Sequence, residues 1–327
     1  MLIDLCNSSN SLCLILLFNQ PNTVKTISII IPVYNEQDTI RILYDQLKQY
    51  CTQGSEIIFI DDGSKDLTLD IIYSIAQTDN NCKCISLSRN FGHQNALMAG
   101  MEHALGDYIV IMDGDLQHPP ELISQMLKKL EEGFDLVITK RNKTENIGTL
   151  KKWSASVFYK FINTISDTNI EANAADFKAF NRKVLESILK FKERDLFLRG
   201  IFTWIGFKTA SLEFTARDRR FGQTKYSFKR MLMLALKGTT SFSYKPLRIA
   251  LLIGSIISIA AFSFGVYAMI QYYNGNTVPG WSSLIIAVMF LGGTQLLAIG
   301  LLGEYIAAIF TEAKHRPLYL IDRKINL

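Results

Sequence analysis

The stretch that decides the fold runs from Tyr108 to Glu121 and reads Tyr-Ile-Val-Ile-Met-Asp-Gly-Asp-Leu-Gln-His-Pro-Pro-Glu. Its first five residues are apolar or aromatic, which is typical of a short strand buried on both faces of a sheet. The strand has to stop at Asp113, because an Asp-Gly-Asp turn is followed by Pro119 and Pro120, which do not continue a strand. The sequence therefore predicts an acidic turn at the carboxyl end of a buried strand.

The two carboxylates of this turn, Asp113 and Asp115, repel each other unless a cation or hydrogen-bond donors occupy the site. In open α/β sheets, ligands bind at the carboxyl ends of the strands. Oxygen ligands of this kind suit Mg²⁺ or Mn²⁺ better than Zn²⁺. We interpret Asp113, Asp115 and Gln117 as the place where a divalent ion meets a phosphate. The alternative is a turn that is acidic without being functional, because short motifs have many chance matches.

The chain before this stretch alternates between strands and helices. Three further strands are expected at 26–32, 56–60 and 84–87, and helices at about 38–50, 66–76 and 94–105. This rhythm predicts an α/β fold with a doubly wound, mostly parallel sheet.

Polar residues follow the first two strands where each one ends. Tyr34 and Glu36 follow the first strand, and Asp61 and Asp62 follow the second, where a carboxylate could accept hydrogen bonds from a base or a ribose. The alternative is that these acids cap the next helix.

No G-x-G-x-x-G follows the first strand and no G-x-x-x-x-G-K-[ST] occurs, which disfavours a Rossmann site and excludes a P-loop. A nucleotide held by carboxylates and a metal fits what remains.

Two uncharged apolar runs, from 249 to about 272 and from 281 to about 303, each reach the length of about 20 residues that a spanning helix requires. Basic residues flank their outer ends, whereas residues 271–280 between them carry no charge. The positive-inside rule then places both chain ends and the N-terminal domain in the cytoplasm. The small-residue patterns Gly254-x-x-x-Ser258 and Ala261-x-x-x-Gly265 make a homo-oligomer plausible, the alternative being that the two helices pack only on each other.

Composition agrees with a membrane-attached protein. The 327 residues are 48% hydrophobic, and the net charge of +5 is concentrated at 215–248 and 314–324, beside the apolar runs. Anionic headgroups are therefore the expected partners of these basic clusters, not a nucleic acid. The five cysteines have neither metal-binding nor disulfide-framework spacing, so we expect reduced thiols.

Three motifs, in order, resemble the signature set of family-2 glycosyltransferases. They are Pro32-x-Tyr34-Asn35-Glu36, Asp61-Asp62-Gly63-Ser64 and the stretch from Asp113 to Pro120. Within that family the chain resembles the polyprenyl-phosphate glycosyltransferases, such as dolichyl-phosphate mannose synthases and bactoprenol glucosyltransferases, from about Thr26 to the C-terminus. The resemblance implies a GT-A fold, a nucleotide-sugar donor, Mg²⁺ or Mn²⁺, and inverting transfer to a lipid phosphate.

The resemblance also implies roles for individual residues. The nucleotide-sugar would lie against Pro32, Tyr34, Glu36, Asp61, Asp62 and Lys225. Catalysis would involve Asp113, Asp115, Asp176 and Arg220, with the metal on Asp113, Asp115 and Gln117. The acceptor phosphate would lie near Arg141, Lys152 and Ser156. The segment from Asp195 to Gly200 resembles another shared segment.

The acceptor phosphate is already anionic, so it needs little help from a base. His93 and His118 are expected near the crevice, and a hydrogen-bonding role is favoured over a catalytic one for His118.

The chain is accordingly divided into five parts. These are a leader at 1–24, a GT-A domain at 25–228 with an interfacial amphipathic helix near 149–165, a juxtamembrane segment at 229–248, a two-helix membrane anchor at 249–310, and a basic cytoplasmic tail at 311–327.

The predicted reaction moves one sugar, glucose from UDP-glucose, to undecaprenyl phosphate. Transfer of mannose or another sugar to dolichyl or polyprenyl phosphate remains open. A processive polysaccharide synthase is disfavoured, because the chain has no Gln-x-x-Arg-Trp and too few apolar runs for a pore. A non-catalytic membrane adaptor that binds a nucleotide-sugar is the alternative from another class.

Overall fold

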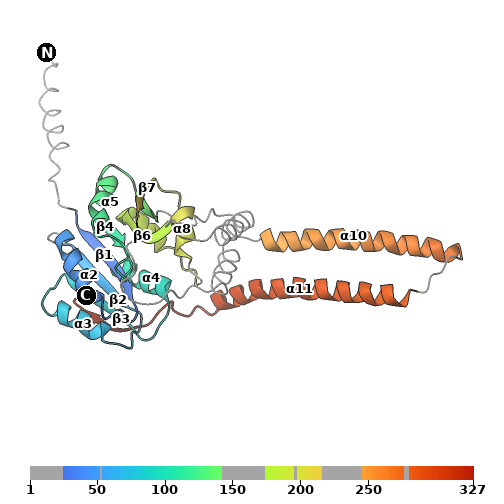
Figure 1. The fold of residues 1–327 in the computed structure, drawn as a ribbon, viewed down its shortest axis with the longest axis horizontal. Helices are drawn as coiled ribbons and strands as arrows, with labels where there is room; N and C mark the ends of the chain where they lie inside the picture. Colours follow the sequence, from blue (N-terminus) through green and yellow to red (C-terminus); the bar gives the residue numbers. More distant parts are fainter. Residues whose placement is uncertain (1–24, 52–53, 142–173, 195–196, 216–244, 276–279) are drawn as a thin grey trace, which may run out of the picture.

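The computed structural model describes residues 25–51, 54–141, 174–194, 197–215, 245–275 and 280–327 (Figure 1). The predicted leader, the predicted amphipathic helix and most of the predicted juxtamembrane segment lie outside these ranges.

The described residues form an eight-stranded mixed sheet in the order β7-β5-β6-β4-β1-β2-β3-β8. Its strands are β1 Ile27–Val33, β2 Glu56–Asp61, β3 Cys82–Leu87, β4 Tyr108–Ile111, β5 Leu136–Arg141, β6 Ala174–Asn181, β7 Thr209–Phe214 and β8 Ile321–Ile325. The four central strands, β3, β2, β1 and β4, are parallel, whereas β6 runs antiparallel to both β4 and β5. The predicted mostly parallel α/β sheet is confirmed.

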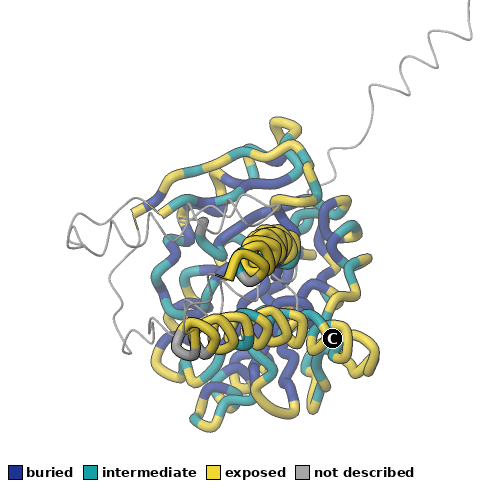
Figure 2. The backbone as a smooth tube through the Cα atoms, turned by 90° about the vertical axis from the view of Figure 1, so that its right-hand side faces the viewer, coloured by how far each residue is buried: buried dark blue, intermediate teal, exposed yellow. Residues whose placement is uncertain are grey.

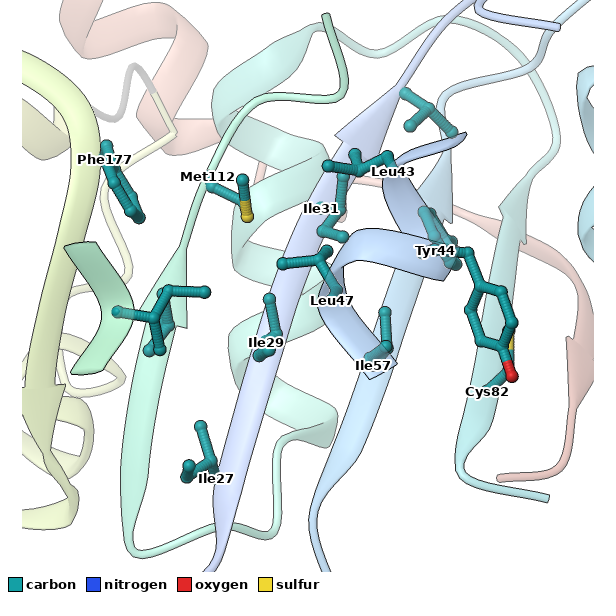
Figure 3. Packing of buried hydrophobic residues seen from close by; sticks show 14 of the residues in the cluster. Ile27, Ile29, Ile31, Leu43, Tyr44, Leu47, Ile57, Cys82, Met112 and Phe177 are labelled. Atoms are coloured by element: carbon teal, nitrogen blue, oxygen red, sulfur yellow. The ribbon is translucent and has the colours of Figure 1, made fainter. Parts of the chain in front are cut away.

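Helices cover both faces of the sheet. They are α2 Ile40–Leu47 with the short 3₁₀ turn η1 Lys48–Tyr50, α3 Thr68–Ala76, α4 His93–His103, α5 Leu122–Glu131, α7 Arg182–Ile188 and α8 Leu198–Trp204. Side chains alternate along β1, so Ile29 and Ile31 pack with α2, α3 and α5, whereas Ile30 packs with α4, α7 and α8. Figure 3 shows the first of these two cores, with Leu43 and Leu47 of α2 facing β1. This two-sided burial explains why the central strands are almost wholly apolar.

Two long helices extend away from the domain (Figure 1). They are α10 Lys245–Tyr273 and α11 Trp281–Ala313, and both are long and apolar enough to cross a membrane over 250–271 and 286–313. Their described side chains are mostly exposed, as the yellow tubes in Figure 2 show. Because exposed apolar surface of this size is unfavourable in water, the structure supports the predicted pair of membrane helices.

The residues after α11 do not form the predicted basic tail. Residues 321–325 form β8, which pairs antiparallel with β3. Ser88 N donates to Leu320 O, and Asn326 Nδ2 donates to the carbonyls of Ala76 and Cys82 at 2.8 and 2.9 Å. This strand has only a weak signal in the sequence, because only two apolar residues flank three charged ones. The strand covers the otherwise open edge of β3 and returns the chain to the sheet after the membrane hairpin.

A buried carboxylate at the first residue of β2, Glu56, fixes the turn that leads into β4. Glu56 Oε2 lies 2.5 Å from Lys83 Nζ, and Glu56 Oε1 accepts hydrogen bonds from Ser28 Oγ and Leu105 N. Gly106 N in turn donates to Ser28 Oγ at 2.8 Å. This network ties the turn before β4 to β1, β2 and β3, and so sets where the strand carrying the acidic turn begins.

We predict that Glu56→Ala destabilises the domain by about 3–5 kcal/mol, because it leaves a largely buried ammonium group without its partner. Chemical denaturation of the detergent-solubilised protein, followed by circular dichroism, measures the change. Glu132→Ala is the matched control, since Glu132 pairs with Lys129 on the surface and should show no measurable loss. Equal stability of Glu56→Ala and wild type would contradict the role of this network.

Candidate active site

The Asp-Gly-Asp turn after β4 packs against the end of β1. A Cβ atom on Gly114 would lie 2.8 Å from Val33 Cγ1, so this close approach favours glycine. Leu116 has a φ of 62°, and Gln117 N donates to Asp115 Oδ1 at 3.1 Å. The turn therefore has a defined conformation that leaves Asp113 and Asp115 half-exposed at the carboxyl edge of the sheet.

The loops after β1 and β2 are joined by hydrogen bonds. Asn35 N donates to Ser64 Oγ at 2.9 Å, Lys65 N donates to Asn35 Oδ1 at 2.8 Å, and Glu36 N donates to Thr68 Oγ1 at 2.8 Å. These bonds bring the motif from Pro32 to Glu36 beside the motif from Asp61 to Ser64, as expected for parallel neighbours. Pro32 is buried, whereas Tyr34 and Glu36 are half-exposed.

Asp61 and Asp62 organise the loops around them. Asp62 accepts the N–H groups of Phe91 and Gly92 at 2.7 and 2.9 Å, while Asp61 accepts Ser64 N and Ser86 Oγ. Burial raises the pKa of Asp62, although the two backbone N–H groups partly oppose this.

The alternative that these acids cap α3 is not what the structure shows, since Thr68 N donates to Asp66. Each carboxylate oxygen can accept more than one hydrogen bond, so contact between Asp61 or Asp62 and a nucleoside stays a prediction.

Gly63 is the point where the β2 loop touches the segment before α4. Its φ is 70°, and a Cβ atom there would lie 2.6 Å from the backbone carbon of Arg89. A side chain at this position would push the two loops apart. It would also displace the carboxylate of Asp62.

Asp176 on β6 is held in a largely buried ion cluster. Arg199 donates to it twice, from Nε at 2.9 Å and from a terminal nitrogen at 2.7 Å, and Lys178 Nζ lies 3.5 Å away. Burial alone would raise the pKa of Asp176, but the Arg199 hydrogen bonds and the two cations outweigh it and hold the pKa well below its usual range. Asp176 is therefore a fixed negative charge.

His93, at the first position of α4, links this cluster to the acidic turn. Its Nε2 lies 3.5 Å from Asp113 Oδ1 and 4.0 Å from Asp176 Oδ2. A pocket of about 180 Å³ opens here, lined by His93, Gln94 and Leu97 of α4, Asp176 of β6, and Phe197, Leu198 and Arg199 at the start of α8. Leu198 N donates to Gln94 Oε1, which fixes α8 against α4. Residues from β4, β6, α4 and α8 thus converge on one site.

The structure brings two of the predicted site residues together, since Asp113 and Asp176 both lie close to His93. Arg141 is exposed at the end of β5. Lys152, Ser156, Arg220 and Lys225 lie outside the described residues.

Sequence reasoning missed Arg199 and Lys178 as site residues. Arg199 falls in the shared segment from Asp195 to Gly200, which was the available signal, but no spacing rule relates it to Asp176, 23 positions earlier.

The donor groups at the turn fit a hard divalent ion only in part. Among the described residues, no group of three or more His, Cys, Asp or Glu side chains could hold a metal by itself. Asp113, Asp115 and Gln117 offer carboxylate and amide oxygens, so the remaining ligands would be phosphate oxygens and water. That division is typical of Mg²⁺ and Mn²⁺ sites that assemble on a bound nucleotide.

Comparison with known proteins shows which family the chain resembles. Residues 28–189 match the family model described as Glycosyl transferase family 2. Residues 245–309, which contain most of α10 and α11, match the GtrB C-terminal hairpin.

An uncharacterized glycosyltransferase, YkcC, from Bacillus subtilis (strain 168) is 39% identical over 92% of this chain and 94% of its own length. The chain belongs to glycosyl transferase family 2. Two other relatives in this family have named activities. A prophage bactoprenol glucosyl transferase homolog of Escherichia coli (strain K12) is 42% identical over 91% of this chain and 98% of its own. The bactoprenol glucosyl transferase of Shigella phage SfV is 41% identical over 91% of this chain and 98% of its own length.

Membership of this glycosyltransferase family confirms the predicted resemblance, the GT-A type of α/β fold and the enzyme class.

We predict that Arg199→Ala moves the acid limb of the activity profile to higher pH. In the wild type the depressed pKa of Asp176 keeps it ionised above about pH 4, and its stabilising contribution is lost only as the pH falls through the folded-state pKa. Without Arg199, its hydrogen bonds and charge no longer oppose the effect of burial, so the carboxyl protonates at a higher pH than in the wild type. Transfer rates measured between about pH 4 and 8 test this.

Arg199→Lys is the conservative control, because it keeps the charge but loses the two-point hydrogen bond. Its acid limb should lie between those of wild type and Arg199→Ala. Identical acid limbs in all three proteins would show that Arg199 does not control Asp176.

Proposed function

We propose that this protein transfers one glucosyl unit from UDP-glucose to a polyprenyl phosphate, undecaprenyl phosphate, at the cytoplasmic face of a membrane. The observation that carries the proposal is that the carboxylates of the Asp-Gly-Asp turn lie near Asp176, with His93 between them. The same domain is joined to a membrane hairpin, because the strand after the hairpin belongs to its sheet. The bactoprenol glucosyl transferase relatives, about 40% identical along nearly all of the chain, support this acceptor and this sugar.

The donor fits along the carboxyl edge of the sheet. Pro32, Tyr34, Glu36, Asp61 and Asp62 surround the nucleoside in this proposal. Its diphosphate then meets Asp113, Asp115 and Gln117 with Mg²⁺ or Mn²⁺. A metal bound there neutralises charge on the departing nucleoside diphosphate. Arg220 and Lys225 add positive charge around the same group.

The acceptor supplies its own nucleophile. A phosphate oxygen of the lipid bonds to the anomeric carbon as the bond from that carbon to the diphosphate oxygen breaks, and the electron pair leaves with UDP. No proton has to be removed, because the phosphate is already anionic. Attack from the face opposite UDP inverts the anomeric carbon. Arg141, Lys152 and Ser156 are the proposed contacts of the acceptor phosphate, and Asp176 orients sugar hydroxyls as a hydrogen-bond acceptor.

The hairpin brings the site to the lipid. Its apolar stretches of 22 and 28 residues span about 33 and 42 Å as helices, enough for a hydrocarbon core of about 30 Å. The outer ends of α10 and α11 both lie on the side of the hairpin nearest the catalytic domain (Figure 1), so they share one side of the membrane. Lys245, Arg248, Lys314 and Arg316 flank these ends, which favours the cytoplasmic side. Association of two or more copies through the small-residue faces of α10 stays a prediction.

We predict that Asp115→Ala abolishes transfer while the protein stays folded. The test incubates purified protein and Mn²⁺ or Mg²⁺ with a panel of radiolabelled nucleotide-sugars and polyprenyl phosphates, then counts label in the organic phase. Asp45→Ala, an exposed acid on α2, is the matched control and should retain full activity. Wild-type turnover by Asp115→Ala would remove Asp115 from the mechanism.

The same panel separates the competing functions. Label from GDP-mannose or transfer to dolichyl phosphate would redirect the substrate assignment, and a ladder of long products would indicate a processive synthase. Donor binding without any labelled lipid would indicate a non-catalytic adaptor.

Removal of divalent cations should stop the reaction, because two carboxylates and a diphosphate otherwise repel each other at the turn. We expect activity to fall to background in excess EDTA and to return when Mn²⁺ or Mg²⁺ is added in excess over the chelator. Full-speed transfer in EDTA would contradict the proposed metal.

A further inference from the structure

His118 is buried directly behind the acidic turn, with only 6% of its surface exposed. Its ring stacks on Phe177 of β6, with centroids 5.1 Å apart and planes 17° apart. The ring of Phe214 on β7 meets it edge-on at 5.8 Å. Two aromatic contacts from different strands therefore fix the plane of the imidazole.

The same imidazole contacts Asp113 in two places. Asp113 N donates to His118 Nδ1 at 3.1 Å, and His118 Nε2 lies 3.8 Å from Asp113 Oδ2. A backbone N–H can only donate, so Nδ1 carries no proton and the ring proton is on Nε2, facing the carboxylate. With one nitrogen engaged and the other protonated, His118 has no lone pair left to act as a base.

We infer that His118 is a positioning residue that holds the backbone and the carboxylate of Asp113 in the orientation a divalent cation requires. The inference rests on the proposed function, because it assumes that Asp113 receives the cation. His118 is buried and both of its ring nitrogens face Asp113, so it acts through Asp113. The sheet therefore supports the acidic turn in two ways. β4 leads directly into the turn, and β6 and β7 hold it through the aromatic contacts of Phe177 and Phe214 with His118.

A histidine that merely fills space in the core would have the same burial but a different pattern of tolerated replacements. Three substitutions separate the two roles. His118→Phe keeps the aromatic ring and loses both polar contacts. His118→Asn places an amide oxygen where Nδ1 lies, so it can still accept from Asp113 N. His118→Gln places its amide near Nε2 and loses that acceptor.

The experiment titrates Mn²⁺ into each full-length purified variant in the presence of UDP without a sugar, and measures free Mn²⁺ by electron paramagnetic resonance. We expect His118→Phe to bind Mn²⁺ about 10–100-fold more weakly than wild type, as for other residues that orient a metal ligand. His118→Asn should bind more tightly than His118→Gln. In turnover assays, excess Mn²⁺ should restore kcat in His118→Asn more fully than in His118→Gln.

His103→Phe is the matched control, because His103 lies at the opposite end of α4, about 15 Å along the helix from the site. It should bind Mn²⁺ like wild type. Melting curves show whether each variant folds; should His118→Phe not fold, the order of the Asn and Gln variants decides.

Two failures are distinguishable in this design. Wild-type protein that binds neither Mn²⁺ nor Mg²⁺ with UDP would overturn the metal in the proposed function, and this inference with it. Normal Mn²⁺ affinity in folded His118→Phe, or tighter binding by His118→Gln than by His118→Asn, would overturn the inference and leave the proposed function standing.

Discussion

Negative charge gathers at one edge of the sheet, and the site depends on how each carboxylate is balanced there. Asp61 and Asp62 are balanced by N–H and O–H donors, which hold the neighbouring loops in place. Asp176 is balanced by two full positive charges, Arg199 and Lys178. Asp113 instead faces two imidazoles, which is a weaker compensation. A cation at the Asp-Gly-Asp turn would add to this compensation and offset the repulsion between the turn carboxylates and an anionic donor.

The membrane hairpin is built into the sheet and not merely attached to its end. Strands β1 to β7 precede the hairpin in the chain and β8 follows it, yet all belong to one sheet. The end of α11 also touches the segment before α8, since Arg194 N donates to Glu312 Oε1 at 2.6 Å. A carboxylate near the C-terminus of a helix is unfavourable by itself, so this contact gives Glu312 a structural reason to be there. The C-terminal end of α11 is thus fixed to the catalytic domain twice, by the Glu312 contact and by β8.

Much of the fold could be predicted because the central strands are continuous apolar runs and each ends in a polar motif. Ile29, Ile30 and Ile31 serve two cores at once, which leaves a clear signal in the sequence. Strand β8 gave no such signal, since its charged residues face solvent and its pairing depends on an edge that only the folded domain presents. The Asp176–Arg199 pair was missed for a related reason: it joins two elements that tertiary packing alone brings together.

Two of the titratable groups near the acidic turn, Asp176 and His118, bear on whether the acceptor could rely on them as a base. Transfer to a hydroxyl would need a base in the site with a pKa near neutrality. Asp176 does not fit that role, because Arg199 and Lys178 stabilise its ionised form and leave it weakly basic. His118 does not fit either, because its unprotonated nitrogen already accepts the N–H of Asp113. Both groups suit a nucleophile that is ionised before it arrives, and a lipid phosphate at the membrane surface is such a nucleophile.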